Sequence, residues 1–151
     1  MELHPDFRAL LAALARASAE YMVIGGYAVG FHGRPRYTKD IDIYFRDTPE
    51  NRGRLADALY AFGAPTTVVA GARDGAASDV LWMGQPPSRV DFLAMIEGVD
   101  FDDAYRARVD TEWNGVRVCV IGIDALIANK RAVGRDQDLL DVKQLENLPR
   151  R

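Results

Sequence analysis

The sequence predicts an α/β (α+β) fold in which helices pack on a small mixed β-sheet. Segments with apolar residues at helical spacing alternate with short apolar runs that suit buried strands. One strand-like segment alternates acidic and apolar residues, and an Asn-Gly pair joins two later strand-like segments. The 151 residues, 48% of them hydrophobic, are enough for one core, so we expect a single domain over 1–151.

Composition narrows the classes of function. A net charge of −3 argues against a surface that binds nucleic acid over its whole extent, although it leaves room for a local basic patch. Cys119 is the only cysteine, which excludes an internal disulfide and a cysteine-based metal site. No run approaches the ~18 apolar residues of a membrane span, and no secretion signal is visible at the N-terminus. We therefore expect a cytoplasmic protein with no membrane partner.

The first elements are predicted to be a helix, a strand and a second, shorter helix. Apolar residues recur at helical spacing over 5–19, and a continuous apolar run over 21–24 indicates a buried strand. A glycine pair follows, and 26–32 is long enough for two helical turns. Gly33 and Pro35 then end this helix.

The next elements are a strand over 40–45 and a helix over 51–62. Thr48 is the expected N-cap of that helix, because Pro49 follows it and suits a first turn. Gly63 ends the helix.

The middle of the chain has the weakest signals. Thr66 to Val69 is rich in β-branched residues and is read as a strand. The stretch 71–78 is read as a loop that either borders a binding cleft or forms a surface excursion. Two further strands are expected over 80–84 and 89–96.

The last third is predicted to contain a helix, a hairpin and two final helices. An acidic start favours the first helix, Asn114-Gly115 marks the turn of the hairpin, and Gly134 separates the final helices. The expected ranges are 100–109 for the first helix, 111–121 for the hairpin, and 124–133 and 136–148 for the final pair.

The glycine pair and the acidic strand carry the chemistry. Gly25 and Gly26 let the backbone approach a phosphate, and a helix that begins there points free N–H groups at the anion. Asp40 and Asp42 share one face of a strand at a separation of roughly 7 Å, so they can converge on hard cations. An ordinary turn and a half-exposed strand explain each feature taken alone. Together they match what Mg²⁺-dependent chemistry on a nucleoside triphosphate requires.

This stretch resembles the signature of the polymerase-beta-like nucleotidyltransferase superfamily. That signature is a Gly-Gly or Gly-Ser turn, a short helix and an Asp-apolar-Asp-apolar strand, here Gly25-Gly26 and Asp40-Ile41-Asp42-Ile43. With His32-Gly33 and Arg36-Tyr37-Thr38 it is similar to two branches: the nucleotidyltransferase toxins of bacterial toxin–antitoxin systems, and the adenylyltransferases that inactivate antibiotics. The resemblance covers about 21–145 and implies a nucleotidyltransferase-like fold.

The resemblance also implies a third carboxylate on a later strand beside the first two. Asp91 holds that position, so Asp40, Asp42 and Asp91 are the expected catalytic residues and the ligands of Mg²⁺ or Mn²⁺. The alternative is that Asp91 partners Arg89 or a backbone amide.

Nucleotide contacts are expected from Gly25, Gly26 and two residues of the basic loop before the strand, Arg36 and Thr38. The loop's cations can hold triphosphate oxygens, or they are simply solvated.

The helical pair at about 124–148 resembles the toxin-like branch through Lys130, Arg135, Asp138 and Asp141. The resemblance makes Lys130 a nucleotide contact and Asp141 the residue that orients it. The alternative is a set of charges on exposed helix faces.

The expected function is transfer of a nucleoside monophosphate from an NTP to a hydroxyl of RNA, protein or a small molecule. In the toxin-like branch, an antitoxin protein is the implied partner. Three alternatives remain open: a non-catalytic nucleotide-binding or antitoxin-like module of the same fold, an antibiotic adenylyltransferase-like enzyme, and a Mg²⁺-dependent hydrolase that uses the same acids.

Overall fold

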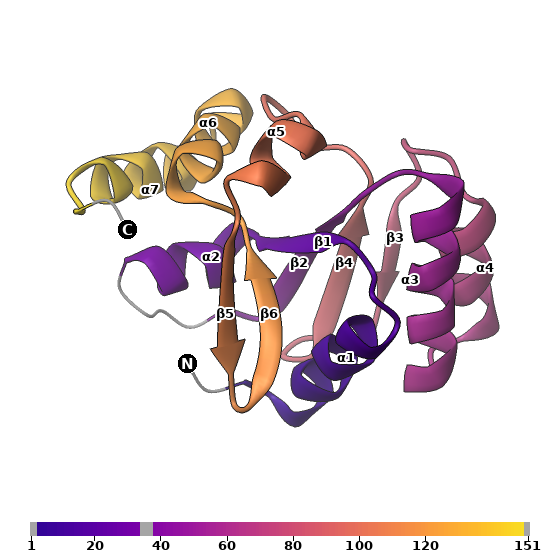
Figure 1. Cartoon of the computed structure of the whole chain (residues 1–151). Helices are drawn as coiled ribbons and strands as arrows, with labels where there is room; N and C mark the ends of the chain where they lie inside the picture. Colours follow the sequence, from indigo (N-terminus) through magenta and orange to yellow (C-terminus); the bar gives the residue numbers. More distant parts are fainter. Residues whose placement is uncertain (1–2, 34–37, 150–151) are drawn as a thin grey trace.

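The computed structural model describes residues 3–33 and 38–149, and its strands form one mixed sheet (Figure 1). The strands are β1 (Tyr21–Ile24), β2 (Asp40–Phe45), β3 (Leu81–Met83), β4 (Arg89–Leu93), β5 (Val109–Trp113) and β6 (Val116–Val120). Their order across the sheet is β3-β4-β2-β1-β6-β5. The pairs β1–β6 and β2–β4 are parallel and the other neighbours are antiparallel. The expected α/β class with a small mixed sheet is confirmed.

The helices within the described residues form two groups beside this sheet. They are α1 (Pro5–Arg16), α2 (Gly25–His32), α3 (Pro49–Phe62), α4 (Thr66–Asp74), α5 (Phe101–Arg106), α6 (Ile123–Val133) and α7 (Asp136–Glu146). Helix α3 packs on both α1 and α4, whereas α2 contacts α6 and α7 (Figure 1). None of the described helices is both long and apolar enough to cross a membrane.

Strand β2 separates the core from the candidate site. Ile41 and Ile43 are fully buried, while Asp40 and Asp42 on the opposite face are only partly buried. This is the alternation that the sequence predicts for a strand with one face in the core. The two aspartates therefore lie on the same face of the sheet, opposite the face that carries Ile41 and Ile43.

Local turn and cap signals are confirmed where the sequence places them. Thr48 Oγ1 accepts a hydrogen bond from the Asn51 backbone N–H at 3.2 Å, which caps α3. Gly63 ends that helix with φ +93°, a left-handed conformation that favours glycine. Asn114 and Gly115 both have positive φ between β5 and β6, as a two-residue hairpin turn requires.

The strand expected at Thr66 to Val69 is wrong, because helix α4 begins there and runs to Asp74. Pro65 stands immediately before the first turn, and Val68 and Ala72, one turn apart, are both buried. The helix packs on α3. Tertiary packing therefore outweighs the strand preference of the β-branched residues.

Two further boundaries differ from the predictions. Strand β4 ends at Leu93 rather than at Ile96, and α5 ends at Arg106, so that Val109 opens β5 instead of closing the helix. The loop after β4 thus starts earlier than expected, and it lies beside the candidate site.

Candidate active site

The three predicted acids lie on one face of neighbouring strands. In the parallel pairing of β2 with β4, Asp42 stands opposite Asp91 and Asp40 stands opposite Arg89. Residues in register on adjacent strands point to the same side of a sheet, as do residues two apart on one strand. Asp40, Asp42, Asp91 and Arg89 therefore share a face. The expectation that Asp91 lies on a strand beside the first two acids is confirmed.

The carboxylate of Asp42 lies against the backbone of Gly25. Ile24, the last residue of β1, is the register partner of Asp42, so the chain turns into α2 directly beside this carboxylate. Gly25 has φ +66°, and a Cβ at this position would collide with Asp42 Oδ2. Both the conformation and the available space favour glycine here.

We predict that Gly25→Ala lowers the free energy of unfolding by about 1–3 kcal/mol, because alanine meets both left-handed strain and the Asp42 carboxylate. Gly63→Ala is the matched control, since Gly63 also has positive φ but its Cβ would meet nothing within 4 Å. Denaturant unfolding measures stability, and calorimetry with Mn²⁺ and NTP measures binding. Only Gly25→Ala is expected to lose binding. Equal stability and equal binding in the two variants would show that the contact between Gly25 and Asp42 is unimportant.

Asp42 is in an electrostatic environment that disfavours its charge. Burial raises its pKa to about 6, and the neighbouring carboxylates of Asp91 and Asp40 add to this increase. Lys130 and Arg135 oppose the shift without cancelling it. The site therefore has an excess of negative charge at neutral pH, which a bound cation would relieve.

Asp40 has an oxygen that is ready to accept a ligand. Its Oδ1 is buried, and among residues 3–33 and 38–149 it has no hydrogen-bond partner. A buried carboxylate oxygen without a partner costs free energy unless something binds it. Carboxylate oxygens are the ligands that Mg²⁺ and Mn²⁺ prefer, so Asp40 and Asp42 fit the expected metal.

Asp91 is engaged by an arginine on its own strand. Arg89 Nη2 donates to Asp91 Oδ1 at 2.9 Å, and Arg89 Nε lies 3.2–3.3 Å from both carboxylate oxygens. The guanidinium also stacks over Trp82, 4.4 Å from the ring centre. Asp91 therefore makes the Arg89 contact that was its alternative role.

The three acids accordingly share a face without converging on one point. Within the described part of the chain, no three His, Cys, Asp or Glu side chains are placed to hold a metal ion together.

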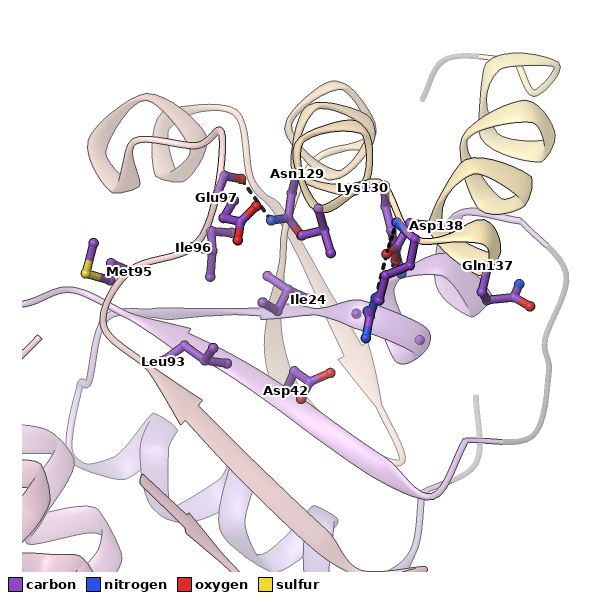
Figure 2. Close-up of a pocket in the computed structure, with 14 residues that line it drawn as sticks. Ile24, Asp42, Leu93, Met95, Ile96, Glu97, Asn129, Lys130, Gln137 and Asp138 are labelled. Carbon is purple, nitrogen blue, oxygen red and sulfur yellow. Dashed lines mark hydrogen bonds and ion pairs between the residues drawn. The ribbon is translucent and has the colours of Figure 1, made fainter. Parts of the chain in front are cut away.

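A pocket of about 580 Å³ opens above Asp42, between the sheet and the helices α6 and α7 (Figure 2). One end has Gly25, Gly26, Lys130 and Arg135, which suit an anion. The remaining described lining residues are Ile24, Leu93, Met95, Ile96, Glu97, Asn129, Val133, Gln137 and Asp138. The pocket therefore combines a polar, cationic end with a largely apolar one.

Asp91 borders a second, smaller hollow of about 330 Å³ that shares Leu93 and Met95 with the main pocket. Residues 77–79 also border this hollow. Of the stretch 71–78 that was read as a loop, 71–74 belong to α4, and Ala77 and Ser78 border this hollow.

Lys130 is buried between two acids of α7. Its Nζ lies 3.2 Å from Asp138 Oδ1 and 3.1 Å from Asp141 Oδ2, and these aspartates are 2% and 1% exposed. Burial alone would raise the pKa of Asp138, but hydrogen bonds from Arg135 and Lys130 hold that pKa below its usual range. The interpretation as exposed helix charges is therefore wrong for Lys130, Asp138 and Asp141, whereas Arg135 is exposed.

The other predicted residues have mixed outcomes. Gly26 lines the pocket, whereas Thr38 is half-buried and is not among the described lining residues. Arg36 lies outside the described residues. His32 is buried, and its Nε2 is 2.7 Å from the backbone oxygen of Ile121, so it connects α2 to the end of β6. Cys119 is buried, and burial raises the pKa of its thiol to about 11, in keeping with a core residue.

Glu97, Asn129 and Gln137 are polar residues of the pocket that were not predicted from the sequence, and the first two lie side by side. Glu97 follows β4, and Asn129 precedes Lys130 on α6. Neither belongs to a recognisable motif. The signals available were the closeness of Glu97 to the strand of Asp91 and of Asn129 to Lys130.

No model of a known protein family matches the sequence, and a search of curated proteins finds no match. The function is therefore inferred from the site and from the resemblance of its motif.

Proposed function

We propose that the protein is a divalent-metal-dependent nucleotidyltransferase. The observation that carries this proposal is the meeting of a glycine turn, the carboxylate of Asp42 and two cations, Lys130 and Arg135, around one pocket. A glycine turn and cations suit phosphate oxygens, and carboxylates on the adjacent strand suit a hard cation. The apolar end of the same pocket has room for the base of a nucleotide.

Each group of residues has a role in this proposal. The backbone of Gly25 and Gly26 faces the β- and γ-phosphates, with Lys130 and Arg135 beside them. Asp40 and Asp42 would hold Mg²⁺ or Mn²⁺, and Asp91 would add a third carboxylate once it is released from Arg89. When bound, the metal supplies positive charge that stabilises the entering and leaving oxygens.

The proposed reaction is a displacement at the α-phosphorus. The acceptor hydroxyl oxygen forms a bond to this phosphorus, and the bond from phosphorus to the bridging oxygen of the β-phosphate breaks. Pyrophosphate leaves, and the hydroxyl proton passes to Asp91 or to solvent. The acceptor class follows the resemblance: a hydroxyl of RNA, of a protein side chain or of a small molecule. An antitoxin protein is a proposed partner if the toxin-like branch is the right one.

The test uses NTPs labelled at the α- or γ-phosphate, with purified protein, Mg²⁺ and cell extract. We predict transfer of the α-label to an acceptor, release of the γ-label as pyrophosphate, and identification of the acceptor by mass spectrometry. Asp40→Asn should lower transfer by about 100-fold or more, because metal charge stabilisation is worth several kcal/mol and each ~1.4 kcal/mol is tenfold in rate. The exposed Asp57→Asn is the control. Unchanged transfer by Asp40→Asn would refute the proposed role of Asp40.

A second candidate function is a non-catalytic nucleotide-binding module. The contact between Arg89 and Asp91 favours it, because the arginine already compensates the third acid. Under this alternative the protein binds NTP, releases no pyrophosphate with any acceptor, and keeps its nucleotide affinity in Asp91→Asn. The labelled-NTP experiment therefore separates the two functions.

A further inference from the structure

The end of the main pocket away from the phosphate-binding residues has the character of a base-binding site. Leu93, Met95 and Ile96 supply its apolar surface (Figure 2), and Val133 of α6 also lines the pocket. The side chains of Met95 and Val133 are 60% and 37% exposed, so a flat aromatic ring that entered here would cover apolar area now in contact with water. When the base binds here, the phosphates of the same nucleotide point toward Gly25 and Gly26.

Two polar groups lie beside this apolar surface, and they come from different elements. Glu97 is on the loop after β4, and Asn129 is on α6; Figure 2 shows them next to each other at the upper side of the pocket. Asn129 is only 8% exposed. Its place at the pocket wall is therefore fixed by packing.

One hydrogen bond sets the orientation of the Asn129 amide. Asn129 Nδ2 donates to the backbone oxygen of Glu97 at 2.9 Å. Because a carbonyl oxygen only accepts, the amide nitrogen must face it, and Oδ1 keeps its capacity to accept. The ionised side chain of Glu97 also only accepts. Together the two side chains offer a base an edge dominated by acceptors.

Guanine fits such an edge better than the other bases. Its N1–H and exocyclic amino group are adjacent donors, which a carboxylate can accept side by side. Adenine and cytosine present one amino group beside an accepting ring nitrogen, and uracil presents one N–H between two carbonyl oxygens. A site built from hydrogen-bonding groups discriminates strongly against a partner that leaves them unpaired. We infer that Glu97 and Asn129 select a guanine nucleotide, an inference that rests on the proposed function because it places the triphosphate at the other end of the pocket.

The test is a comparison of five nucleotides by calorimetry with Mn²⁺: GTP, ITP, ATP, CTP and UTP, each with a methylene group in place of the α,β-bridging oxygen so that no transfer occurs. ITP differs from GTP only by the exocyclic amino group. The GTP analogue is expected to bind about tenfold or more tightly than the ITP analogue, the factor for loss of a hydrogen bond to a charged group. It should also bind more tightly than the other three.

Two variants connect this selection to the residues. Glu97→Gln keeps the size of the side chain but turns one acceptor into a donor, so the ratio of GTP to ITP affinity should fall toward one. Glu112→Gln, at an exposed position of the hairpin strand β5, should leave the ratio unchanged. Thermal unfolding checks that both variants fold.

The outcomes separate this inference from the proposed function. Equal binding of the five analogues, preference for another base, or an unchanged ratio in folded Glu97→Gln overturns guanine selection while nucleotide binding stands. Binding of none of them overturns the proposed function and this inference together.

Discussion

Replacing Lys130 with alanine is expected to lower the free energy of unfolding by about 3–5 kcal/mol, the cost of removing one partner from a buried ion pair. Lys130 is 7% exposed and its Nζ contacts both Asp138 and Asp141. The alanine variant leaves the Asp141 carboxylate without this cation and leaves Asp138 with Arg135 alone. The interface between α6 and α7 would then contain two buried carboxylates without the lysine that compensates their charge.

Denaturant unfolding measures this effect, and Lys143→Ala is the matched control because Lys143 is exposed on α7. The control should change stability by less than about 0.5 kcal/mol. The triple variant Lys130→Met, Asp138→Asn, Asp141→Asn removes the buried charges together and should recover much of the loss. If Lys130→Ala behaved like Lys143→Ala, the buried ion-pair cluster would not contribute to the fold.

The burial of Lys130 between two aspartates also affects its proposed contact with the nucleotide. A lysine held by two carboxylates has part of its charge compensated before any phosphate arrives. Its effect on NTP is therefore coupled to the packing of α6 on α7. Calorimetry on the folded fraction of Lys130→Ala separates the two effects, because unchanged NTP affinity there would make Lys130 a structural residue at the pocket wall.

Most of the fold was predictable because its elements carry local signals. Thr48 and Gly63 mark the two ends of α3, and Asn114-Gly115 marks a hairpin, since each needs only its own backbone conformation. Helix α4 was missed for the opposite reason. Its β-branched start favours a strand locally, and only packing on α3 makes it helical.

The residues of the candidate site likewise include some that local sequence signals predict and some that they do not. The spacing of Asp40 and Asp42 fixes their common face, and the glycine pair follows a strand that pairs with theirs, so both were predictable. The burial of Asp138 and Asp141 was not, because a charged residue on a helix is normally exposed unless another helix covers it. Glu97 and Asn129 are brought together only by the tertiary structure, and no spacing in the sequence predicts their contact.

Asp42→Asn is expected to stabilise the metal-free protein at pH 7 by on the order of 2–3 kcal/mol, the difference between an ordinary aspartate pKa and a raised one. Burial raises the folded-state pKa of Asp42 from 3.8 to about 6, helped by the charges of Asp91 and Asp40. Ionisation at neutral pH therefore opposes folding. Asparagine has a similar shape and no charge, so it removes that cost.

The pH dependence follows from the same shift. Between pH 3.8 and about 6 the folded state binds the Asp42 proton more tightly than the unfolded state does, so the free energy of unfolding falls as the pH rises through this window. The gain from Asp42→Asn should be near zero below the window, grow across it and stay constant above it. Denaturant unfolding in a chelator at several pH values measures this gain, with the exposed Asp57→Asn as the control.

Added Mg²⁺ or Mn²⁺ should reverse the order of stability of the two proteins. A cation that binds only the folded parent stabilises it by mass action, and the variant lacks one of the proposed ligands. We therefore expect the parent to gain unfolding free energy with metal concentration while Asp42→Asn gains little. A variant that is less stable than the parent in chelator at pH 7, or a metal-induced gain equal in both, would show that Asp42 supports the fold rather than a cation site.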